Sequence, residues 1–420
     1  MKKSISLKVL VVLASVALLA GFSTIAAAKE IKIGGIMDTT GGTSDVGKDY
    51  AIGMSDAYKY INEQGGVNGK EIKYTWFDYG YRIPEAITKY KMLKRMGSVV
   101  IMGWGTGDTE ALSPTVNKDK IPYVSASYSA HLTDPKKTPY NLFFSSDYST
   151  NARSCITAWF DKKWKNHPDF GKRKPRFACC YMFASPYCSA AIKAIKDQAT
   201  LLGFEIGDDQ DVSLFALDTK SQIMALQAFK PDLLWHGNTT MSAAATIRDA
   251  YALKLGAAWI VNNWAMDENL PRLAGEAAEG VMGATPCAFF NQPNVKNMDI
   301  VVKSAEKYSP GVPLAKRLNR TIQAWADALI TWEAMKRTDA KGVDVTKADA
   351  GAAIMKEGFE TLRNYDVGLG AAPISFTPTD HRPATGCIVQ EWKGGKFQIV
   401  DNVDLKKRWP DLWETKWLGW

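Results

Sequence analysis

The sequence predicts an α/β protein with two lobes, each built on a mainly parallel sheet. Three observations support this prediction. Apolar strand-like segments alternate with amphipathic helical segments before residue 140, the same alternation restarts after residue 150, and 420 residues exceed the usual length of one domain. Alternating strands and helices favour parallel pairing. The hydrophobic fraction of 46% is sufficient for two cores.

The first half of the chain has the order expected of such a sheet. Residues 47–62 carry apolar side chains at helical spacing, and Pro84 suits the first turn of a helix. The predicted order is strand 30–36, helix 47–62, strand 71–78, helix 84–95 and strand 99–102.

The turn after strand 99–102 is the first candidate ligand site. Glycines alternate with Trp104 and Thr106 from Gly103 to Gly107, which frees the backbone for a tight turn. Asp108 is expected to cap a helix over 109–118, and the next strand, 121–129, runs into a hydroxyl-rich loop. Ligands of open α/β sheets bind outside the carboxyl ends of strands, and a helix N-terminus favours an anion. Alternatively, the glycines make only a sharp turn.

The second half repeats this architecture. Its polar and aromatic loops 183–187, 236–240 and 262–264 follow predicted strands, as two lobes closing on one ligand require. The predicted order is helix 153–164, strand 176–182, helix 188–202, strand 204–208, helix 220–229, strand 232–235, helix 241–253 and strand 258–261.

The pattern changes after residue 280. We expect extended segments at 281–285 and 373–376, helices at 295–308 and 318–337, and a hairpin of 387–392 with 396–400 around a Lys-Gly-Gly turn. The tail from Lys406 is rich in Lys and Trp. Its sequence predicts no role.

The N-terminus has the pattern of a secretory signal peptide, which we assign to residues 1–28. A basic start precedes an apolar run broken only by Lys8 and Ser15, and Ala26 to Ala28 match a small-residue cleavage site. The run is short for a membrane span, no later run reaches about 18 apolar residues, and no cysteine follows it for lipid attachment. We expect an exported protein that begins near Lys29.

Removal of this segment lowers the net charge from +8 to +5, because it holds three lysines and no acidic residue. The basic clusters 162–165 and 172–174 contribute much of the excess. Neither cluster contains an aromatic array or a binding module, so we expect a solvated face and no nucleic-acid partner. Partner docking or a membrane-proximal role stays open.

Six cysteines in an exported chain predict at least one disulfide. Six cysteines allow 15 connectivities, which leaves the pairing open. No paired Cys-x-x-Cys motif or histidine cluster is present, so we expect no metal site and no cofactor. The first four cysteines are the expected pool, and the last two could approach each other: Cys155, Cys179, Cys180, Cys188, Cys287 and Cys387.

Several segments together resemble the leucine/isoleucine/valine-type periplasmic solute-binding proteins of ABC importers. The most specific is Asn62-Glu63-Gln64-Gly65-Gly66-Val67-Asn68-Gly69-Lys70. The others are 32–36, 99–109, 121–125 and 374–382, and the resemblance covers essentially the whole mature chain except the Trp-rich tail.

The resemblance implies the type I periplasmic binding protein fold, with two Rossmann-like lobes joined by three crossovers near 143–147, 284–290 and 376–382. Lobe 1 would comprise 29–144 plus 286–378, and lobe 2 would comprise 145–285 plus 379–420. It also implies a monomeric, non-enzymatic periplasmic protein. Such a protein closes on a small ligand and delivers it to an ABC permease in the inner membrane.

The resemblance further implies the ligand contacts. Backbone amides and hydroxyls matching Gly107 and Ser129 would hold a ligand carboxylate, and the carbonyl of Ser127 would accept from its ammonium. Lobe 2 would add an aromatic ring, a residue matching Thr239 and an acid near 263–267. The full set of candidate residues is Trp104, Thr106, Gly107, Asp108, Ser127, Tyr128, Ser129, Tyr187, Asn238, Thr239, Asn263, Trp264 and Asp267.

Asp108 is expected to decide the ligand class. As a helix cap it would occupy the first free amides, and the ligand would be neutral or an amine. Turned into the cleft it would pair with an ammonium group, and we expect this case. The ligand is then an amino acid, and Trp104, Tyr128 and Trp264 favour an apolar, branched-chain or aromatic side chain.

Other functions stay open. The ligand could be an amide, urea or an aromatic carboxylate, and the protein could be a ligand-sensing subunit. A secreted hydrolase would use Cys188 or a serine as nucleophile and His236 as base. The sequence contains no Gly-x-Ser-x-Gly nucleophile motif, which argues against the hydrolase.

Overall fold

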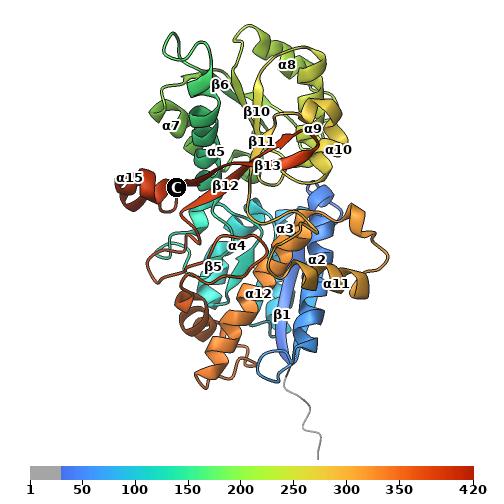
Figure 1. Cartoon of the computed structure of the whole chain (residues 1–420). Coiled ribbons are helices and arrows are strands. Elements are labelled where there is room, and N and C mark those ends of the chain that lie inside the picture. Colours follow the sequence, from blue (N-terminus) through green and yellow to red (C-terminus); the bar gives the residue numbers. More distant parts are fainter. Residues whose placement is uncertain (1–29) are drawn as a thin grey trace, which may run out of the picture.

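The computed structural model describes residues 30–420 and consists of two α/β lobes, one above the other (Figure 1). The predicted signal peptide lies outside these residues and stays a prediction. In the described part of the chain, no helix combines the length and the apolar character that a membrane span requires.

Lobe 1 contains a five-stranded parallel sheet in the order β2-β1-β3-β4-β5. The short strand β3 is buried along its whole length, as expected for a parallel sheet with both faces covered. The elements of this lobe up to residue 142 are β1 Ile31–Met37, α2 Ser44–Glu63, β2 Ile72–Asp78, α3 Ile83–Arg95, β3 Val100–Gly103, α4 Thr106–Asp119, β4 Tyr123–Ser125 and β5 Asn141–Leu142.

Lobe 2 contains a sheet in the order β13-β12-β11-β10-β9-β6-β7, and β8 also pairs with β6. The strands from β7 to β11 are parallel, and β12 and β13 join as an antiparallel hairpin. Its elements are α5 Tyr148–Lys162, β6 Arg176–Tyr181, α6 Pro186–Ser189, α7 Ile192–Leu201, β7 Glu205–Ile206, β8 Gln210–Asp211, α8 Lys220–Gln227, β9 Leu233–His236, α9 Thr240–Ala252, β10 Ala258–Val261, α10 Asn269–Ala274, β11 Met282–Thr285, β12 Gly386–Lys393 and β13 Lys396–Asp404.

The chain passes between the two lobes three times. It leaves the first sheet after β5, returns after β11 so that α11 (Met298–Tyr308) and α12 (Asn319–Ala340) pack against α2, and re-enters the second sheet at β12. The predicted fold class is therefore confirmed. The residue limits given above for each lobe stay predictions.

Several predicted elements differ from the structure. The strand predicted at 121–129 is limited to β4, and the helix predicted at 188–202 is divided into α6 and α7. Helix α4 begins at Thr106 rather than at 109, because Gly105 takes the N-cap position. Residues 373–376 form no strand and make only an isolated bridge from Ile374 to Tyr365. The predicted hairpin is present, and Gly394 and Gly395 both have positive φ angles, as its two-residue turn requires.

The expected disulfide is not formed, because all six cysteines are free and buried. Cys179 and Cys180 are neighbours on β6 and therefore face opposite sides of the sheet, in different core clusters. The Cys287 thiol donates to the carbonyl of Asn319. Burial and contact with the thiol of Cys387 raise the pKa of Cys155.

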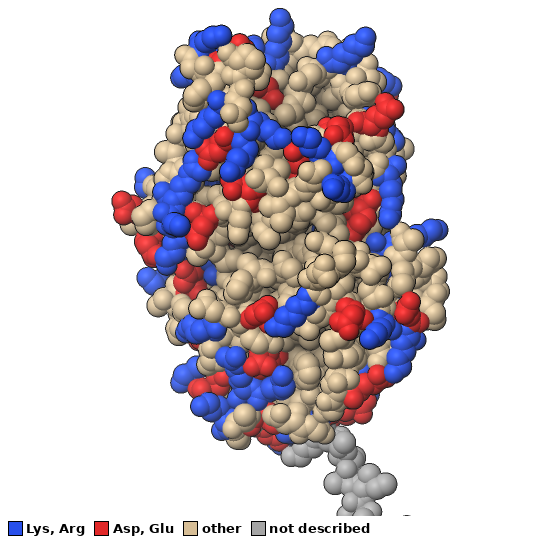
Figure 2. All heavy atoms as spheres, viewed as in Figure 1, with Lys and Arg blue, Asp and Glu red and all other residues tan. Residues whose placement is uncertain are grey.

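The basic clusters of the sequence lie on lobe 2, where acidic side chains pair with them. Lys163 contacts Glu391 at 2.8 Å, and Arg173 contacts Asp232 at 2.6 Å. Figure 2 shows Lys and Arg interspersed with Asp and Glu across the visible face of the upper lobe. This pairing fits the solvated face that the sequence predicted.

The C-terminal tail contacts both lobes and lies beside their junction, where α15 (Pro410–Thr415) is drawn in Figure 1. The Trp413 ring is 2% exposed and packs under the guanidinium of Arg382, 3.9 Å from the ring centroid. The Gly419 amide donates to Thr133 Oγ1 at 3.1 Å in lobe 1. The Lys193 ammonium of lobe 2 lies 3.3 Å from the centroid of the Trp420 ring.

We predict that Trp413→Ala lowers the free energy of unfolding by about 3–5 kcal/mol, because truncation of a fully buried Trp leaves a cavity. Urea denaturation of the variant measures this loss. Trp420→Ala, at a partly exposed position, is the control and should cost less. A loss at Trp413 no larger than at Trp420 would show that the tail is not part of the folded core.

Candidate functional site

The strand ends of the two lobes meet around a small cavity of about 20 Å³. This volume is close to the room that one water molecule needs, so side chains nearly fill the closed cleft. None of the lining residues is charged. They are Thr43, Val46, Tyr81, Trp104, Gly105, Thr106 and Ala126 from lobe 1, and Tyr148, Tyr187, Thr239 and Trp264 from lobe 2.

Two larger hollows lie elsewhere. One of about 920 Å³ borders the amino-terminal ends of β9, β10 and β11, and one of about 710 Å³ borders the segments that connect the lobes. Ligands of parallel α/β sheets bind at the opposite, carboxyl ends of the strands. The small cavity between the lobes is therefore the candidate ligand site despite its size.

A chain of hydrogen bonds fixes the Trp104 ring in the wall of lobe 1. The Asp38 carboxylate follows β1 and accepts from the Thr43 hydroxyl at 2.7 Å and from the Thr43 amide at 2.9 Å. The Thr43 hydroxyl in turn accepts from Trp104 Nε1 at 2.8 Å. The loops after β1 and β3 therefore hold each other in place.

The N-terminus of α4 supplies the polar part of the same wall. Gly105 is its N-cap and has no side-chain cap, and the Asp108 carboxyl accepts from the N–H groups of Gly105 and Asp108, so the N–H groups of Thr106 and Gly107 are left for an anion. A Cβ atom at Gly105 would lie 2.3 Å from Asp108 Oδ1 and 2.5 Å from the Tyr79 hydroxyl. Only glycine fits there. The Thr106 hydroxyl accepts from Ser127 Oγ at 2.8 Å.

Asp108 is neither the N-cap of α4 nor a lining residue of the cavity. Because α4 begins three residues earlier than expected, Asp108 is the third residue of the helix, where its carboxyl still accepts from the backbone N–H groups of Gly105 and Asp108. Its Oδ1 atom accepts from the Tyr79 hydroxyl at 2.7 Å. Burial raises the pKa of Asp108 to about 7, and the hydrogen bonds from Tyr79 and from the backbone amides of Asp108 and Gly105 oppose this rise.

The other predicted residues of lobe 1 lie around the cavity rather than in its wall. The Ser127 carbonyl accepts from Ser125 Oγ at 3.1 Å, and Ser129 Oγ donates to Glu110 at 2.7 Å. Tyr128 stacks on Trp264. A Cβ atom at Gly107 would lie 3.3 Å from the side chain of Ile83 and 3.3 Å from that of Pro186 in lobe 2.

Lobe 2 closes the cavity with aromatic rings. Trp264 Nε1 donates to the Tyr148 hydroxyl at 2.9 Å, and the Tyr187 hydroxyl donates to Asn262 Oδ1 at 3.2 Å. Asn238 lies outside the cavity, where its amide group donates to the Val212 carbonyl at 2.8 Å and thereby positions the loop.

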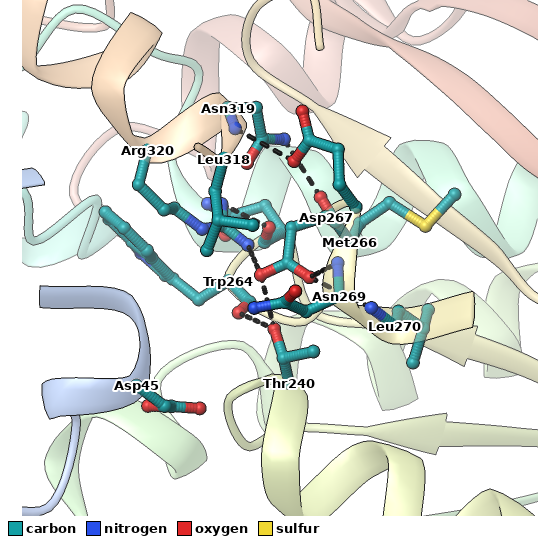
Figure 3. Close-up of polar contacts among 12 residues, drawn as sticks. Asp45, Thr240, Trp264, Met266, Asp267, Asn269, Leu270, Leu318, Asn319 and Arg320 are labelled. Carbon is teal, nitrogen blue, oxygen red and sulfur yellow. Dashed lines mark hydrogen bonds and ion pairs between the residues drawn. The ribbon is translucent and has the colours of Figure 1, made fainter. Parts of the chain in front are cut away.

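Asp267 is fully engaged by a network at the interface of the lobes (Figure 3). Its Oδ2 atom accepts from the Thr240 hydroxyl at 2.6 Å and from Arg320 at 3.1 Å, and its Oδ1 atom accepts from the amides of Asn269 and Leu270. Arg320 comes from α12, which packs on lobe 1. No oxygen of Asp267 is left for a ligand ammonium.

Arg320 also donates to the Asn263 carbonyl at 3.0 Å. Next to it, the Asn319 amide donates to Glu268 at 2.9 Å, and the Asn319 side chain donates to the Met266 carbonyl at 3.0 Å. The loop 263–268 of lobe 2 thus holds the N-terminus of α12. Burial, with a smaller contribution from neighbouring Asp267, raises the pKa of Glu268 to about 7.

One further acid faces lobe 2 from α2. Asp45 Oδ2 accepts from the Met241 amide at the start of α9, at 3.3 Å. Asp45 Oδ1 is buried and has no hydrogen-bond partner. Burial raises the pKa of Asp45 to about 6, and the contacts with the Met241 amide and the Thr239 hydroxyl oppose the rise.

Five of the sequence-predicted site residues line the cavity: Trp104, Thr106, Tyr187, Thr239 and Trp264. The sequence reasoning missed Tyr81 and Tyr148, although both follow strand ends and aromatic residues there were a usable signal. It also missed Arg320, because an arginine in the first turn of a helix gives no signal of its contacts with another lobe.

The proposed nucleophile and base of a hydrolase are unsuited to that chemistry. His236 Nε2 contacts Thr246 Oγ1 at 3.0 Å, and burial lowers the pKa of His236 to about 3. Burial raises the pKa of Cys188 to about 12. Within residues 30–420, no three His, Cys, Asp or Glu residues are grouped to hold a metal ion.

A family model described as "Periplasmic binding protein" matches residues 30–396. The chain belongs to the periplasmic binding protein family. A search of curated proteins finds no match. Membership implies a periplasmic location, a small-molecule ligand and a permease partner.

Solved structures of this family agree with the fold. A substrate-binding protein of an ABC transporter from Aeropyrum pernix is 30% identical over 90% of this chain and 96% of its own, with a TM-score of 0.77. The protein is thus a substrate-binding protein of the ABC transporter type.

Two more distant structures show the same fold. One, a branched chain amino acid ABC transporter protein from Thermus thermophilus with bound valine, is 21% identical over 91% of this chain and 99% of its own, with a TM-score of 0.80. The other, a solute binding protein from R. palustris in complex with benzoate, is 18% identical over 89% of this chain and 96% of its own, with a TM-score of 0.69.

We predict that Asp108→Asn alters the pH dependence of stability. The raised pKa of Asp108 means that the folded protein binds its proton more tightly than the unfolded chain does, so this carboxyl destabilises the fold as pH rises from about 4 to about 7. Between pH 5 and pH 8, the free energy of unfolding of the variant should rise relative to that of the wild type by up to roughly 3 kcal/mol.

Urea denaturation at several pH values measures this difference. The control is Asp299→Asn, at an exposed position, whose stability should follow the wild type at every pH. A constant difference between Asp108→Asn and the wild type across this range would contradict the raised pKa.

Proposed function

We propose that this protein is the monomeric solute-binding component of an ABC importer, and that its ligand is a small carboxylate with an aromatic or branched apolar body. The ligand binds between the lobes and is delivered to a permease of the inner membrane. The observation that carries this proposal is the cavity between the lobes, lined by aromatic rings, bordered by the start of α4 and free of charged side chains.

The start of α4 supports binding of the carboxylate. Gly105 and Thr106 line the cavity, and the N–H groups of the first helical turn carry the positive end of the helix dipole. No arginine or lysine in the lining competes for this role. The rings of Trp104, Trp264 and Tyr187 support an apolar or aromatic ligand body.

The state of the acidic residues favours a carboxylate without an ammonium group over the amino acid that the sequence suggested. Asp267 is occupied by Arg320 and Thr240, and Asp108 faces Tyr79. A buried ammonium without an anionic partner is costly. The benzoate complex of the structural relative from R. palustris agrees with this class.

An amino-acid ligand is the second candidate, because Asp45 retains one buried oxygen without a partner beside the cleft. An ammonium group that reaches Asp45 Oδ1 would satisfy it. The bound valine of the relative from Thermus thermophilus agrees with this alternative. Asp45→Asn separates the two candidates, since it should abolish amino-acid binding and leave carboxylate binding intact.

We predict that benzoate and similar carboxylates bind, and that benzamide and phenylalanine bind at least tenfold more weakly. Isothermal titration calorimetry gives the affinities, and thermal unfolding gives an independent measure, since ligand at a hundred times Kd stabilises by about 2.7 kcal/mol. Tighter binding of phenylalanine than of benzoate would support the amino-acid candidate. Binding of benzamide alone would refute the carboxylate.

Two variants test whether the N-terminus of α4 binds the carboxylate. Gly105→Ala should weaken benzoate binding strongly, because the new Cβ atom displaces Asp108 and Tyr79 at the start of the helix. Gly107→Ala is the matched control in the same turn, where the atoms nearest to the new Cβ lie 3.3 Å away rather than 2.3 Å. Equal effects on affinity would argue against this anion site.

A further inference from the structure

Trp264 belongs to lobe 2, but its ring is inserted among aromatic rings of lobe 1. It follows β10 in the chain and meets Trp104 edge to face, with 5.0 Å between ring centroids. It stacks on Tyr128 at 5.7 Å with an angle of 24° between the planes, and it contacts Tyr50 at 6.3 Å. The ring therefore occupies the cleft where the two lobes meet.

Polar contacts fix the orientation of this ring. Trp264 Nε1 donates to the Tyr148 hydroxyl at 2.9 Å, and the Trp264 amide donates to Asn262 Oδ1 at 3.0 Å. The Arg320 guanidinium lies 4.9 Å from the ring centroid and is itself held by Asp267, as Figure 3 shows. A rotated ring would leave a buried N–H without a partner and would lose the cation–π contact.

The fixed ring limits the space for a ligand. Trp264 is the largest side chain that lobe 2 contributes to the cavity, and it faces Trp104 across the cleft. If the lobes separate to admit a ligand, its apolar body would enter between these two rings. A longer body would then reach Trp264, whose hydrogen bond from Nε1 to the Tyr148 hydroxyl lies within lobe 2 and is kept when the lobes separate.

We propose that Trp264 is the residue that sets the upper size of the ligand, restricting it to a single ring or a short branched chain. This inference rests on the proposed function, in which a small carboxylate binds between the lobes. Trp264 acts as a specificity residue, because its ring contacts the apolar body of the ligand, whereas the N-terminus of α4 binds the carboxylate.

The test compares the affinities for benzoate and 2-naphthoate, which share the carboxylate and differ by one fused ring. Wild-type protein should prefer benzoate by at least about tenfold, a range expected when extra apolar atoms meet a pocket wall. Trp264→Ala should reduce this preference at least about tenfold or reverse it, and Trp264→Phe should lie between them. Calorimetry of each protein with both ligands gives the ratios.

Trp259→Ala is the matched control, because Trp259 is a buried tryptophan on β10 that lies outside the cavity. Trp259→Ala should lower the free energy of unfolding and keep the wild-type ratio of the affinities for benzoate and 2-naphthoate. If Trp264→Ala fails to fold, Trp264→Phe and Trp264→Leu still provide the comparison. We expect the preference for benzoate over 2-naphthoate to decrease from the wild type to Trp264→Phe and further to Trp264→Leu.

An unchanged ratio in folded Trp264 variants would overturn the role of Trp264 while leaving the proposed function intact. Wild-type protein that binds neither carboxylate would overturn the proposed ligand class, and this inference with it. The two failures are therefore distinguishable.

Discussion

The closed arrangement of the lobes depends on the buried contact between Arg320 and Asp267. The two side chains come from different lobes and are 3.1 Å apart, and neither is exposed. Removing both charges from water is costly, so such a pair adds little net stability, whereas loss of one partner leaves a buried charge and costs several kcal/mol. Its effect is therefore to define how the lobes meet.

Because Arg320 approaches from α12, the contact between Arg320 and Asp267 also determines which groups are available to bind a ligand. It occupies Asp267, an acid in the segment 263–267 that the family resemblance placed among the ligand contacts, and it places a guanidinium against the Trp264 ring. The cavity is left with aromatic walls and a helix N-terminus. Recognition thus depends on shape, apolar contact and backbone amides rather than on an ion pair with a side chain.

Much of the fold could be predicted from the sequence, since it depends on local patterns. Alternating strands and helices indicated two parallel sheets, and Gly394 with Gly395 indicated the β12–β13 hairpin. Part of the site could be predicted in the same way. Trp104 and Thr106 follow β3, and residues at the carboxyl ends of parallel strands meet in a cleft.

The features that could not be predicted depend on contacts between segments that are distant in the sequence, or on shifts of a few residues in where an element begins. The start of α4 differs by three residues from the expected start, which was enough to turn Asp108 toward Tyr79. Arg320 lies 53 residues from Asp267 along the chain, and no local pattern reports that contact. The cysteines suggested a disulfide through their number alone, although Cys179 and Cys180 face opposite sides of one strand.

The proposed function requires that a small carboxylate binds in the cavity between the two lobes. Small-angle X-ray scattering of the protein with and without saturating benzoate tests it most directly, with saturation established by calorimetry. We expect a smaller radius of gyration with the ligand, because the lobes rotate about their three connections. Identical scattering curves at saturation would contradict it.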